Sequence, residues 1–376
     1  MWKTIQIYYY NEDRHGLIAD AIRPAVEQLE RQGAMDRFWF ESHWKRGPHV
    51  NLHFDADESR FSSIILPHVR EIVGAYLEQH PSAVSVNEQE AERLHRELAK
   101  EEFESGPFTP FYPDNSIQVS EYTVRPEFWG SQESADLAVA FRVDTVRTVF
   151  DLVDHIRGDY HRRLETVMGL MVATVGAHGR LKGRHMCYRS HFEGFLAYQD
   201  TDGQIRAAMK EWYTENEAWL ARTLRKWFDM AGGKKRPSLA MARWMETVRD
   251  HYARFQAAAE SGHARLYGLD DIRENVKEFR PDEAITVTAS PSIYHRFLDE
   301  LPGATWDPAA FDAFRYSVNS TYNWFPVLGL TPLERYFLCY AIATYAETYY
   351  QKSWWQIALD GQPMPAGFSP EALTHA

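Results

Sequence analysis

Cysteine is nearly absent from this sequence of 376 residues, which contains only Cys187 and Cys339. Neither belongs to a Cys-x-x-Cys pair, and both fall in segments with helical spacing. A disulfide framework is therefore excluded. The chain begins Met1-Trp-Lys and continues directly into a β-type run, so the sequence predicts no secretory signal peptide. Together these features predict a reduced, cytoplasmic protein.

Long apolar runs and an excess of basic residues are missing as well. The longest apolar stretches, residues 164–175 and 336–345, are too short or too interrupted to cross a bilayer, so no membrane partner is expected. The 53 acidic residues outnumber the 41 lysines and arginines, which gives a net charge of −12. Binding to a phosphate backbone needs clustered basic residues, so direct nucleic-acid binding is not expected either.

Sequence motifs for common cofactors and metals are also missing. No Gly-x-Gly-x-x-Gly follows a β-type run, and the Gly-x-x-x-x-Gly-Lys-Ser/Thr, Gly-x-Ser-x-Gly and His-Glu-x-x-His patterns do not occur. His49 and His53 lie on one strand, about 13 Å apart at the usual strand rise, which is too far to chelate one ion. His185 and His191 face different sides of a predicted helix. The sequence thus predicts neither a metal site nor a cofactor.

Residues 36–54 carry the clearest structural pattern in the chain. Two β-type runs, 38–43 and 49–54, flank a polar turn that contains Arg46. Alternation with a period of two puts the apolar positions 50, 52 and 54 on one face of the second run and His49, Asn51 and His53 on the other. A buried strand avoids three polar side chains on one face unless each has a partner. The polar row is therefore either an open sheet face or the wall of a site.

The order of patterns along the chain predicts an α+β fold. The first 80 residues read strand, helix, strand, strand, helix, which is typical of an antiparallel sheet with helices on one face, as in ferredoxin-like folds. Beyond residue 130 the apolar spacing is mainly helical. We therefore expect an α+β region with a ferredoxin-like antiparallel sheet over residues 1–130, and a mainly helical region packed on it over residues 131–376. A single domain that contains both regions is the alternative.

The segment 188–193, Tyr-Arg-Ser-His-Phe-Glu, is the densest group of functional side chains. One interpretation is an amphipathic helix in which Arg189 and Glu193 form a solvated i,i+4 pair and the serine and histidine have partners in the interior. The other interpretation is catalytic. His191 would shuttle protons, while Ser190 and Arg189 would hold a carbonyl or carboxylate group. The residues alone leave both interpretations open.

A second polar group, Ser317, Asn319 and Tyr322, lies near the end of a predicted helix. Its structural interpretation is a helix end that caps and packs. Its functional interpretation is that the Asn319 amide orients peptide amides while the Tyr322 hydroxyl donates a proton to a developing oxyanion. These two interpretations also remain open.

Five segments carry a resemblance to a known family: residues 2–10, 17–24, 36–54, 188–196 and 317–335. They resemble the C-terminal, elimination-type domain of lantibiotic dehydratases, which also occurs as a stand-alone protein in thiopeptide gene clusters. The resemblance covers most of the chain and is strongest over residues 1–55. It implies a role in the maturation of a ribosomally synthesised peptide.

The chain departs from the eliminating members at two places. In those members the second strand of the hairpin carries two arginines, which grip the glutamyl ester; here these positions are Asn51 and His53. Neither side chain offers a bidentate guanidinium fork. The Asn-Arg pair that usually follows four residues after a helical histidine has no match after His191. The pattern Arg-Ser-His-x-Glu-x-Phe-Leu is closer to thiopeptide-type cyclases, which join two dehydroalanines in a formal [4+2] ring closure and expel water and the leader peptide.

The resemblance therefore implies a leader-guided cyclase that needs no cofactor. The expected catalytic residues are Tyr188, Ser190, His191, Ser317 and Tyr322. The expected substrate-binding residues are Arg46, His49, Asn51, His53, Arg189 and Asn319, with Arg46 or Arg189 as candidates to replace the missing arginines. The expected partners are a precursor peptide with its leader and the other peptide-modifying enzymes of the pathway.

Two other functions remain open. One is a lyase that eliminates glutamate from glutamylated Ser or Thr, with His191 or His53 in place of the missing groups. The other is a non-catalytic homologue that binds the peptide within a biosynthetic complex. The sequence leaves the oligomeric state open, a dimer included.

Overall fold

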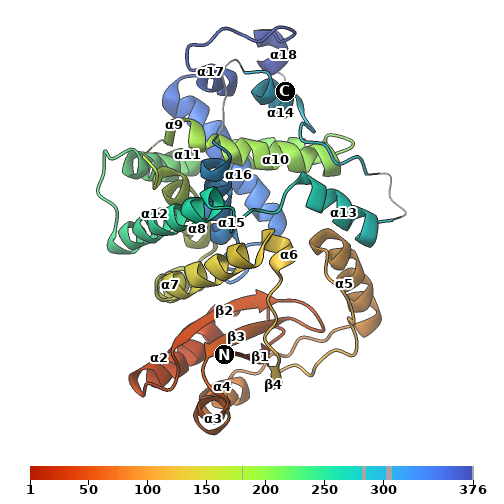
Figure 1. The fold of residues 1–376 in the computed structure, drawn as a ribbon, viewed down its shortest axis with the longest axis vertical. Helices are drawn as coiled ribbons and strands as arrows, with labels where there is room; N and C mark the ends of the chain where they lie inside the picture. Colours follow the sequence, from red (N-terminus) through yellow and green to blue (C-terminus); the bar gives the residue numbers. More distant parts are fainter. Residues whose placement is uncertain (180, 282–284, 302–306, 375–376) are drawn as a thin grey trace. The chain divides into compact units, whose positions relative to one another are not determined.

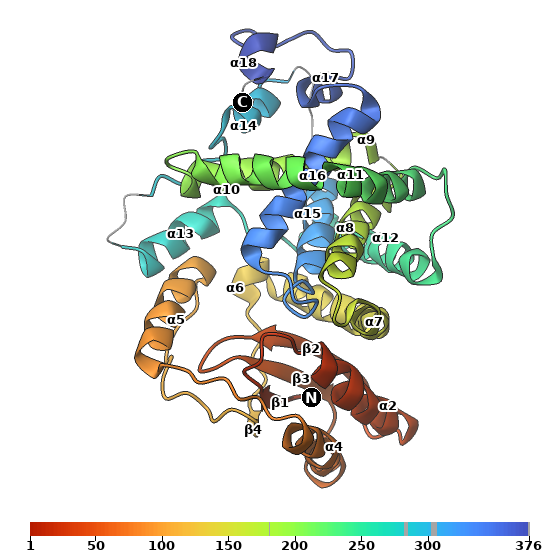
Figure 2. The ribbon, with the colours of Figure 1, turned by 180° about the vertical axis from the view of Figure 1, so that it is seen from behind.

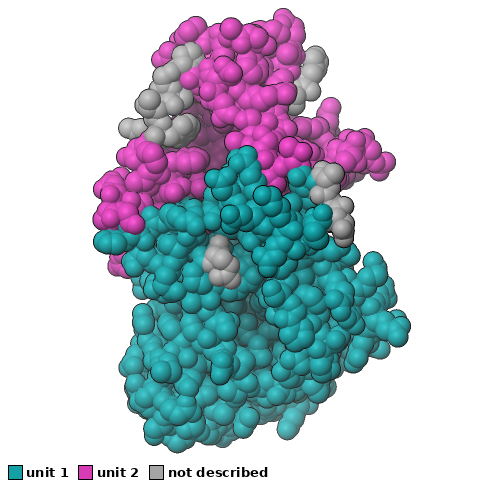
Figure 3. Space-filling model, turned by 45° about the vertical axis from the view of Figure 1, so that its right-hand side comes forward, with its two compact units in different colours: residues 1–163, 263–285, 322–329 teal, residues 164–262, 286–321, 330–376 magenta. Residues whose placement is uncertain are grey.

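The structure is a computed structural model that describes residues 1–179, 181–281, 285–301 and 307–374. The chain forms two compact units, each built from several segments and coloured separately in Figure 3. Unit 1 comprises residues 1–163, 263–285 and 322–329, and unit 2 comprises residues 164–262, 286–321 and 330–376. The division that we expected between residues 130 and 131 stays a prediction.

Unit 1 contains a four-stranded antiparallel sheet with the strands β1 (Trp2–Tyr8), β2 (Arg37–His43), β3 (His49–Asp55) and β4 (Ser116–Ser120). Its helical elements are α1 (His15–Leu17), the π-helical η1 (Ile18–Ile22), α2 (Arg23–Arg31), α3 (Glu58–Arg60), the π-helical η2 (Phe61–Ile65), α4 (Leu66–Gln79), α5 (Glu88–Glu102), α6 (Pro126–Trp129), α7 (Gln132–Ile156) and α13 (Leu269–Phe279). The strand order is β2-β3-β1-β4, so β1 and β3 are central (Figure 1).

The expected α+β class is confirmed, because the sheet lies near the N-terminus and most of the remaining described chain is helical. The hairpin is also confirmed: β2 and β3 pair antiparallel, with His43 opposite His49 next to the turn. The ferredoxin-like detail of the expectation stays a prediction.

The apolar face of the sheet packs against α7, which lies beside β2 (Figure 1). Phe38 and Phe40 of β2 stack on Phe150 of α7, with ring centroids 6.3 and 5.1 Å apart. Phe54 of β3 is fully buried and lies 5.0 Å from the Phe38 ring. Burial of each such ring contributes about 1.5–3 kcal/mol. Because these rings fix one face of the hairpin against the core, the alternate residues of β3 must point to the opposite face.

The turn between β2 and β3 depends on a glycine. Gly47 has a φ of 114°, a conformation that other residues rarely adopt. A Cβ atom at this position would also clash with the Tyr10 hydroxyl. Gly47 is therefore required both by its backbone conformation and by the close approach of Tyr10.

Unit 2 is helical in its described residues. Its helices are α8 (Tyr160–Gly176), α9 (Leu181–Arg184), α10 (Met186–Gln199), α11 (Gln204–Ala231), α12 (Leu239–Glu260), α14 (Ile293–Asp299), α15 (Pro308–Tyr322), α16 (Pro332–Tyr350), α17 (Trp354–Leu359) and α18 (Pro370–Thr374). Unit 2 begins within α8, at Leu164, and α15 belongs to it up to Thr321.

Helix α10 packs against α16, which crosses it within unit 2 (Figure 2). Phe195 stacks on Tyr336 with ring centroids 4.0 Å apart, and Phe192 meets Tyr340 edge-on at 5.3 Å. This packing fixes the orientation of α10, which carries the segment 188–193. Among the described residues, no helix is both long and apolar enough to span a membrane.

Candidate functional site

The polar row predicted on β3 faces the polar side chains of its neighbouring strands. We call this surface the polar sheet face; it consists of Thr4, Gln6 and Tyr8 of β1, Trp39, Glu41 and His43 of β2, and His49, Asn51 and His53 of β3. It is not an open sheet face, since all three β3 residues are buried. The sequence allowed two interpretations of the polar row, an open sheet face or the wall of a site. The burial of these residues excludes the open sheet face.

Cross-strand hydrogen bonds satisfy most of the polar sheet face. Thr4 Oγ1 lies 3.0 Å from His53 Nδ1 in a directly opposed pair. The Gln6 amide donates to Asn51 Oδ1 at 3.1 Å and lies 3.3 Å from His49 Nε2. Burial lowers the pKa of His49 to about 3 and also lowers that of His53, so both imidazoles are neutral at neutral pH. This surface therefore offers neutral donors and acceptors held in a fixed register.

One charge pair lies on the polar sheet face. Arg142 of α7 donates to the Glu41 carboxylate, and Glu41 Oε1 lies 3.5 Å from His53 Nε2. Burial acts to raise the pKa of Glu41, but Arg142 and His53 hold it well below its usual value, so Glu41 is ionised. The Trp39 ring stacks on His53 at 4.0 Å and lies 4.4 Å from the Arg142 guanidinium carbon. Sequence reasoning missed Arg142, because no local pattern links a residue of α7 to this face.

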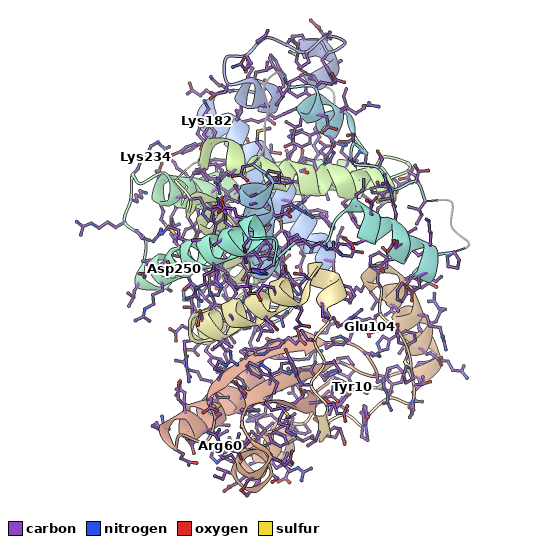
Figure 4. All side chains as sticks on the ribbon, in the orientation of Figure 1. Tyr10, Arg60, Glu104, Lys182, Lys234 and Asp250 are labelled. Carbon is purple, nitrogen blue, oxygen red and sulfur yellow. The ribbon has the colours of Figure 1, made fainter. Side chains whose placement is uncertain are left out.

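Arg46 ties the hairpin turn to a neighbouring loop. Its Nε donates to the Pro110 carbonyl at 2.9 Å and its Nη1 to the Tyr112 hydroxyl at 3.1 Å. The guanidinium also lies 4.2 Å from the Tyr112 ring. Figure 4 shows Tyr10 and Glu104 on the same α5 side of unit 1. These contacts give Arg46 a structural role in holding the turn.

In unit 2, Tyr188 and Arg189 have firmly fixed side chains. The buried Tyr188 hydroxyl donates to the Met171 carbonyl at 2.7 Å, and burial raises its pKa well above the usual value. Arg189 contacts Glu193 at 3.3 Å and Glu347 of α16 at 2.8 Å. The Arg189–Glu193 pair thus forms, but it is buried rather than solvated, because only 2% of the Glu193 side chain is exposed.

Ser190 belongs to a hydrogen-bonded chain that sequence reasoning missed. Its Oγ lies 2.9 Å from Nε2 of His295, and Nδ1 of His295 lies 2.8 Å from Oγ of Ser292. Burial lowers the pKa of His295, so its imidazole is neutral and donates through one nitrogen while accepting at the other. A serine, a neutral histidine and an orienting third group are the parts that proton transfer requires. His295 is on α14, far from Ser190 in sequence, so no spacing pattern could have found it.

His191 lies on the next position of α10 in a cationic environment. Burial, together with Arg335, Arg315 and His295, lowers the pKa of His191 to about 3. The imidazole is therefore neutral at neutral pH. It can donate or accept one hydrogen bond, but it is not a protonated acid there.

The second polar group does not form one cluster in the described structure. Ser317 is buried and its hydroxyl donates to the Ala313 carbonyl at 2.9 Å. Asn319 is exposed on α15. Tyr322 belongs to unit 1, where its ring lies 5.1 Å from that of Phe325. The described residues contain no cluster of His, Cys, Asp and Glu that could hold a metal ion.

The family of the chain follows from comparison with known proteins. A family model described as lantibiotic biosynthesis dehydratase C-term matches residues 2–301. The chain belongs to this family. No curated protein sequence matches it.

Two solved structures resemble the chain over nearly its whole length. The pyridine synthase TbtD from thiomuracin biosynthesis is 25% identical with a TM-score of 0.72, over 93% of this chain and 99% of TbtD. TsrL is 19% identical with a TM-score of 0.69, over 96% of this chain and 99% of TsrL, and at this identity the likeness shows the fold alone. Family membership and the likeness to TbtD support a role as a modifying enzyme in the maturation of a ribosomally synthesised peptide.

Proposed function

We propose that this chain is a cyclase that closes a ring between two dehydroalanine residues of a peptide by a formal [4+2] reaction. The likeness to the pyridine synthase TbtD, which extends over 93% of this chain and 99% of TbtD, carries the proposal. In this reaction one dehydroalanine with its tautomerised amide adds to the alkene of the other, and loss of water and the leader peptide then gives a pyridine. Holding two reactive groups together can supply about 7–11 kcal/mol of the barrier reduction. The remaining task is proton transfer.

The chain Ser190–His295–Ser292 is our candidate for that proton transfer. When Ser292 Oγ accepts from Nδ1–H of His295, Nε2 becomes the acceptor for the Ser190 hydroxyl, at 2.9 Å. Ser190 would then take the N–H proton of a substrate amide while its own hydroxyl proton passes to Nε2 of His295, and the imidazolium so formed would return a proton through Ser190 to the amide oxygen, which also accepts a hydrogen bond from a second N–H group. Neutral His191 is the proposed donor to that oxygen.

The other predicted residues have supporting roles in the proposal. Tyr188 fixes α10 through its bond to Met171, and Arg189 fixes it through Glu347. Asn319 would contact the peptide, whereas the buried Ser317 supports α15 through its hydrogen bond to Ala313. In unit 1, Tyr322 and the polar row His49, Asn51 and His53 are proposed to bind a separate part of the peptide, with Arg46 holding the turn.

The hydrogen bonds and the ion pair of the polar sheet face favour cyclisation over glutamate elimination. A glutamyl ester carries a carboxylate that a free guanidinium would have to bind. On this face Asn51 and His53 have hydrogen-bond partners, and the arginine that reaches it, Arg142, is paired with Glu41. Elimination remains the second candidate because Arg142 does bring a guanidinium there. The substrate carboxylate would have to displace Glu41, which is the reason to rank elimination below cyclisation.

The proposal extends to fold detail, partners and location. We propose that the sheet with α2 and α4 is ferredoxin-like, since its chain order is β-α-β-β-α-β. The substrate would be a precursor peptide with its leader, shared with other modifying enzymes of the pathway. The cytoplasm would be the site of action.

Two synthetic peptides test the proposal on the full chain. Both carry the leader of the precursor peptide encoded nearest to this chain's gene; one contains two dehydroalanines and the other a glutamyl-Ser ester. We expect mass spectrometry to show loss of leader and water from the first peptide and no change in the second. The Ser190→Ala variant serves as the control for slow chemical cyclisation.

Each other result replaces the proposal by a named alternative. Loss of glutamate from the second peptide with no change in the first would establish the lyase. Binding of both peptides without any change of mass would establish a non-catalytic homologue.

A further inference from the structure

A group of cationic and aromatic side chains in unit 2 is not used by the proposed reaction. It consists of His178 after α8, Arg184 at the end of α9, Arg249 and Tyr252 of α12, and Phe314 of α15. We call it the cation–ring group. Figure 4 labels Lys182 and Asp250, which lie on the two helices that carry Arg184 and Tyr252.

Two aromatic rings hold the side chains of Arg184 and His178 in the cation–ring group. The Arg184 guanidinium carbon lies 5.6 Å from the Tyr252 ring and 5.1 Å from the Phe314 ring. The His178 ring lies 4.3 Å from the Tyr252 ring and 6.4 Å from that of Phe314. His178 and Arg184 therefore share the same two rings. The Tyr252 hydroxyl donates to the Ala310 carbonyl, so this ring is fixed in turn.

The cation–ring group lacks a counter-charge in the part of the chain that the structure describes. Arg184 forms no ion pair there, and its Nη1 and the Nε2 of His178 are buried atoms without a hydrogen-bond partner. Many other arginines in the described part of this acidic chain are paired with carboxylates, as Arg189 and Arg206 are with Glu193. Buried polar atoms in proteins are nearly always satisfied, so these two unsatisfied atoms need an explanation. Burial, with smaller contributions from Arg184 and Arg249, lowers the pKa of His178 to about 3, so its imidazole is neutral at neutral pH.

We propose that the cation–ring group binds a carboxylate, supplied by an acidic side chain of the peptide substrate; the identity of that peptide rests on the proposed function. One guanidinium provides the charge and the bidentate donors that a carboxylate prefers. The neutral His178 adds a single donor. The rings of Tyr252 and Phe314 suit the methylene stem of a Glu or Asp side chain.

Such a contact would hold the peptide at one point away from the ring that is being closed. It would act on binding and not on the chemical step. Arg184 is therefore a binding residue in this proposal, and its loss should weaken affinity without changing the rate at saturating peptide.

Fluorescence anisotropy with labelled hexaglutamate tests the site on the full chain. We expect the unmodified chain to bind this probe despite its own net charge of −12, and Arg184→Met to bind it roughly tenfold more weakly. Unlabelled hexaglutamine should not compete. Lys226→Met is the matched control, because Lys226 also lies over a ring, that of Trp227 at 4.3 Å, but is already paired with Glu165 at 2.8 Å. Its affinity should not change.

The outcomes separate this proposal from the proposed function. Equal affinity in Arg184→Met, or no binding of hexaglutamate up to millimolar concentration, overturns the carboxylate site and leaves Arg184 as a structural cation over two rings. If Arg184→Met does not fold, Arg184→Lys replaces it; weaker binding by several-fold supports the site and unchanged binding overturns it. Because the assay needs no turnover, failure of ring closure leaves its result intact. A chain that closes the ring but does not bind hexaglutamate loses this site alone.

Discussion

Ser190 and His295 are 105 positions apart in the sequence, yet Ser190 Oγ lies 2.9 Å from His295 Nε2. The other imidazole nitrogen of His295, Nδ1, lies 2.8 Å from Ser292 Oγ. Ser292 caps the N-terminus of α14, and its hydroxyl oxygen accepts a hydrogen bond from the His295 backbone N–H. The imidazole is thus oriented by its own helix while it faces α10. In the tautomer in which Nδ1–H donates to Ser292, Nε2 of His295 faces the Ser190 hydroxyl and can accept its proton.

The first prediction concerns His295. Replacing it by alanine should lower the rate of ring closure by about 10²-fold, because the Ser190 hydroxyl loses its proton acceptor. The free energy of unfolding should fall by about 1–3 kcal/mol, since two neutral hydrogen bonds, to Ser190 and to Ser292, are lost from a partly exposed site. Single-turnover mass spectrometry and urea unfolding measure the two quantities.

Two serine variants control this experiment. Ser292→Ala removes the orienting group and the helix cap and should lower the rate less than His295→Ala does. Ser190→Ala should lower the rate of ring closure as much as His295→Ala does, and the double variant should be no slower than either single variant. Multiplying effects would show that the two residues do not act as one relay.

The hairpin and the α+β class could be predicted from sequence because they depend on local patterns. Alternation along residues 49–54 determines which side chains of β3 share a face, and the structure places them so. The pairing of Arg189 with Glu193 likewise follows from i,i+4 spacing. What the spacing could not show is that Glu193 is buried, since this depends on α11 and α16 packing around it.

The contacts that define the candidate site could not be predicted, because they join distant segments. Arg142 reaches Glu41 from a helix about 100 positions away, and Ser190 meets His295 across a similar separation. For the segment 317–322, closeness in sequence did not predict which side chains meet. Asn319 is exposed, and the Ser317 hydroxyl donates to a carbonyl of its own helix. Sequence proximity groups candidate residues; only packing decides which of them meet.

The second prediction uses the buried His49. Its pKa is about 3 in the folded chain against 6.5 for an ordinary histidine, so between these values the unfolded chain binds a proton that the folded chain does not. Stability must therefore fall as the pH drops below about 6.5, by roughly 1 kcal/mol per such histidine between pH 7 and 5.5. In His49→Gln this pH dependence should be smaller by that amount, as measured by urea unfolding at both pH values. The exposed His155→Gln is the control, and an equal reduction there would contradict the assignment.

The third prediction concerns the charge pair on the polar sheet face. Arg142→Met leaves the ionised Glu41 without its cation, and we expect the free energy of unfolding to fall by about 2 kcal/mol. This is less than for a fully buried pair, because 26% of the Glu41 side chain is exposed. Adding Glu41→Gln to this variant removes the unpaired charge and should restore most of the loss. A double-mutant cycle of unfolding free energies measures this coupling, and additive effects would show that the pair contributes nothing to stability.

The fourth prediction separates the role of His191 from that of a titrating acid or base. Because its pKa is about 3, through burial and the nearby Arg335 and Arg315, His191 stays neutral from pH 5 to 8. The wild-type rate of ring closure should therefore show no inflection from His191 in this range. His191→Ala should lower the rate by about tenfold or more at every pH, through loss of a hydrogen-bond donor to the amide oxygen.

His191→Gln is the informative companion variant, because its side-chain amide keeps an N–H donor but cannot titrate. We expect it to retain more activity than His191→Ala, with the same flat pH profile. A wild-type inflection near pH 6.5 that disappears in both variants would instead mean that bound peptide raises the pKa of His191 and that the residue exchanges a proton with substrate. In that case the Ser190–His295 relay and His191 would have to share the proton transfers, and His295→Ala would keep the inflection while lowering the rate.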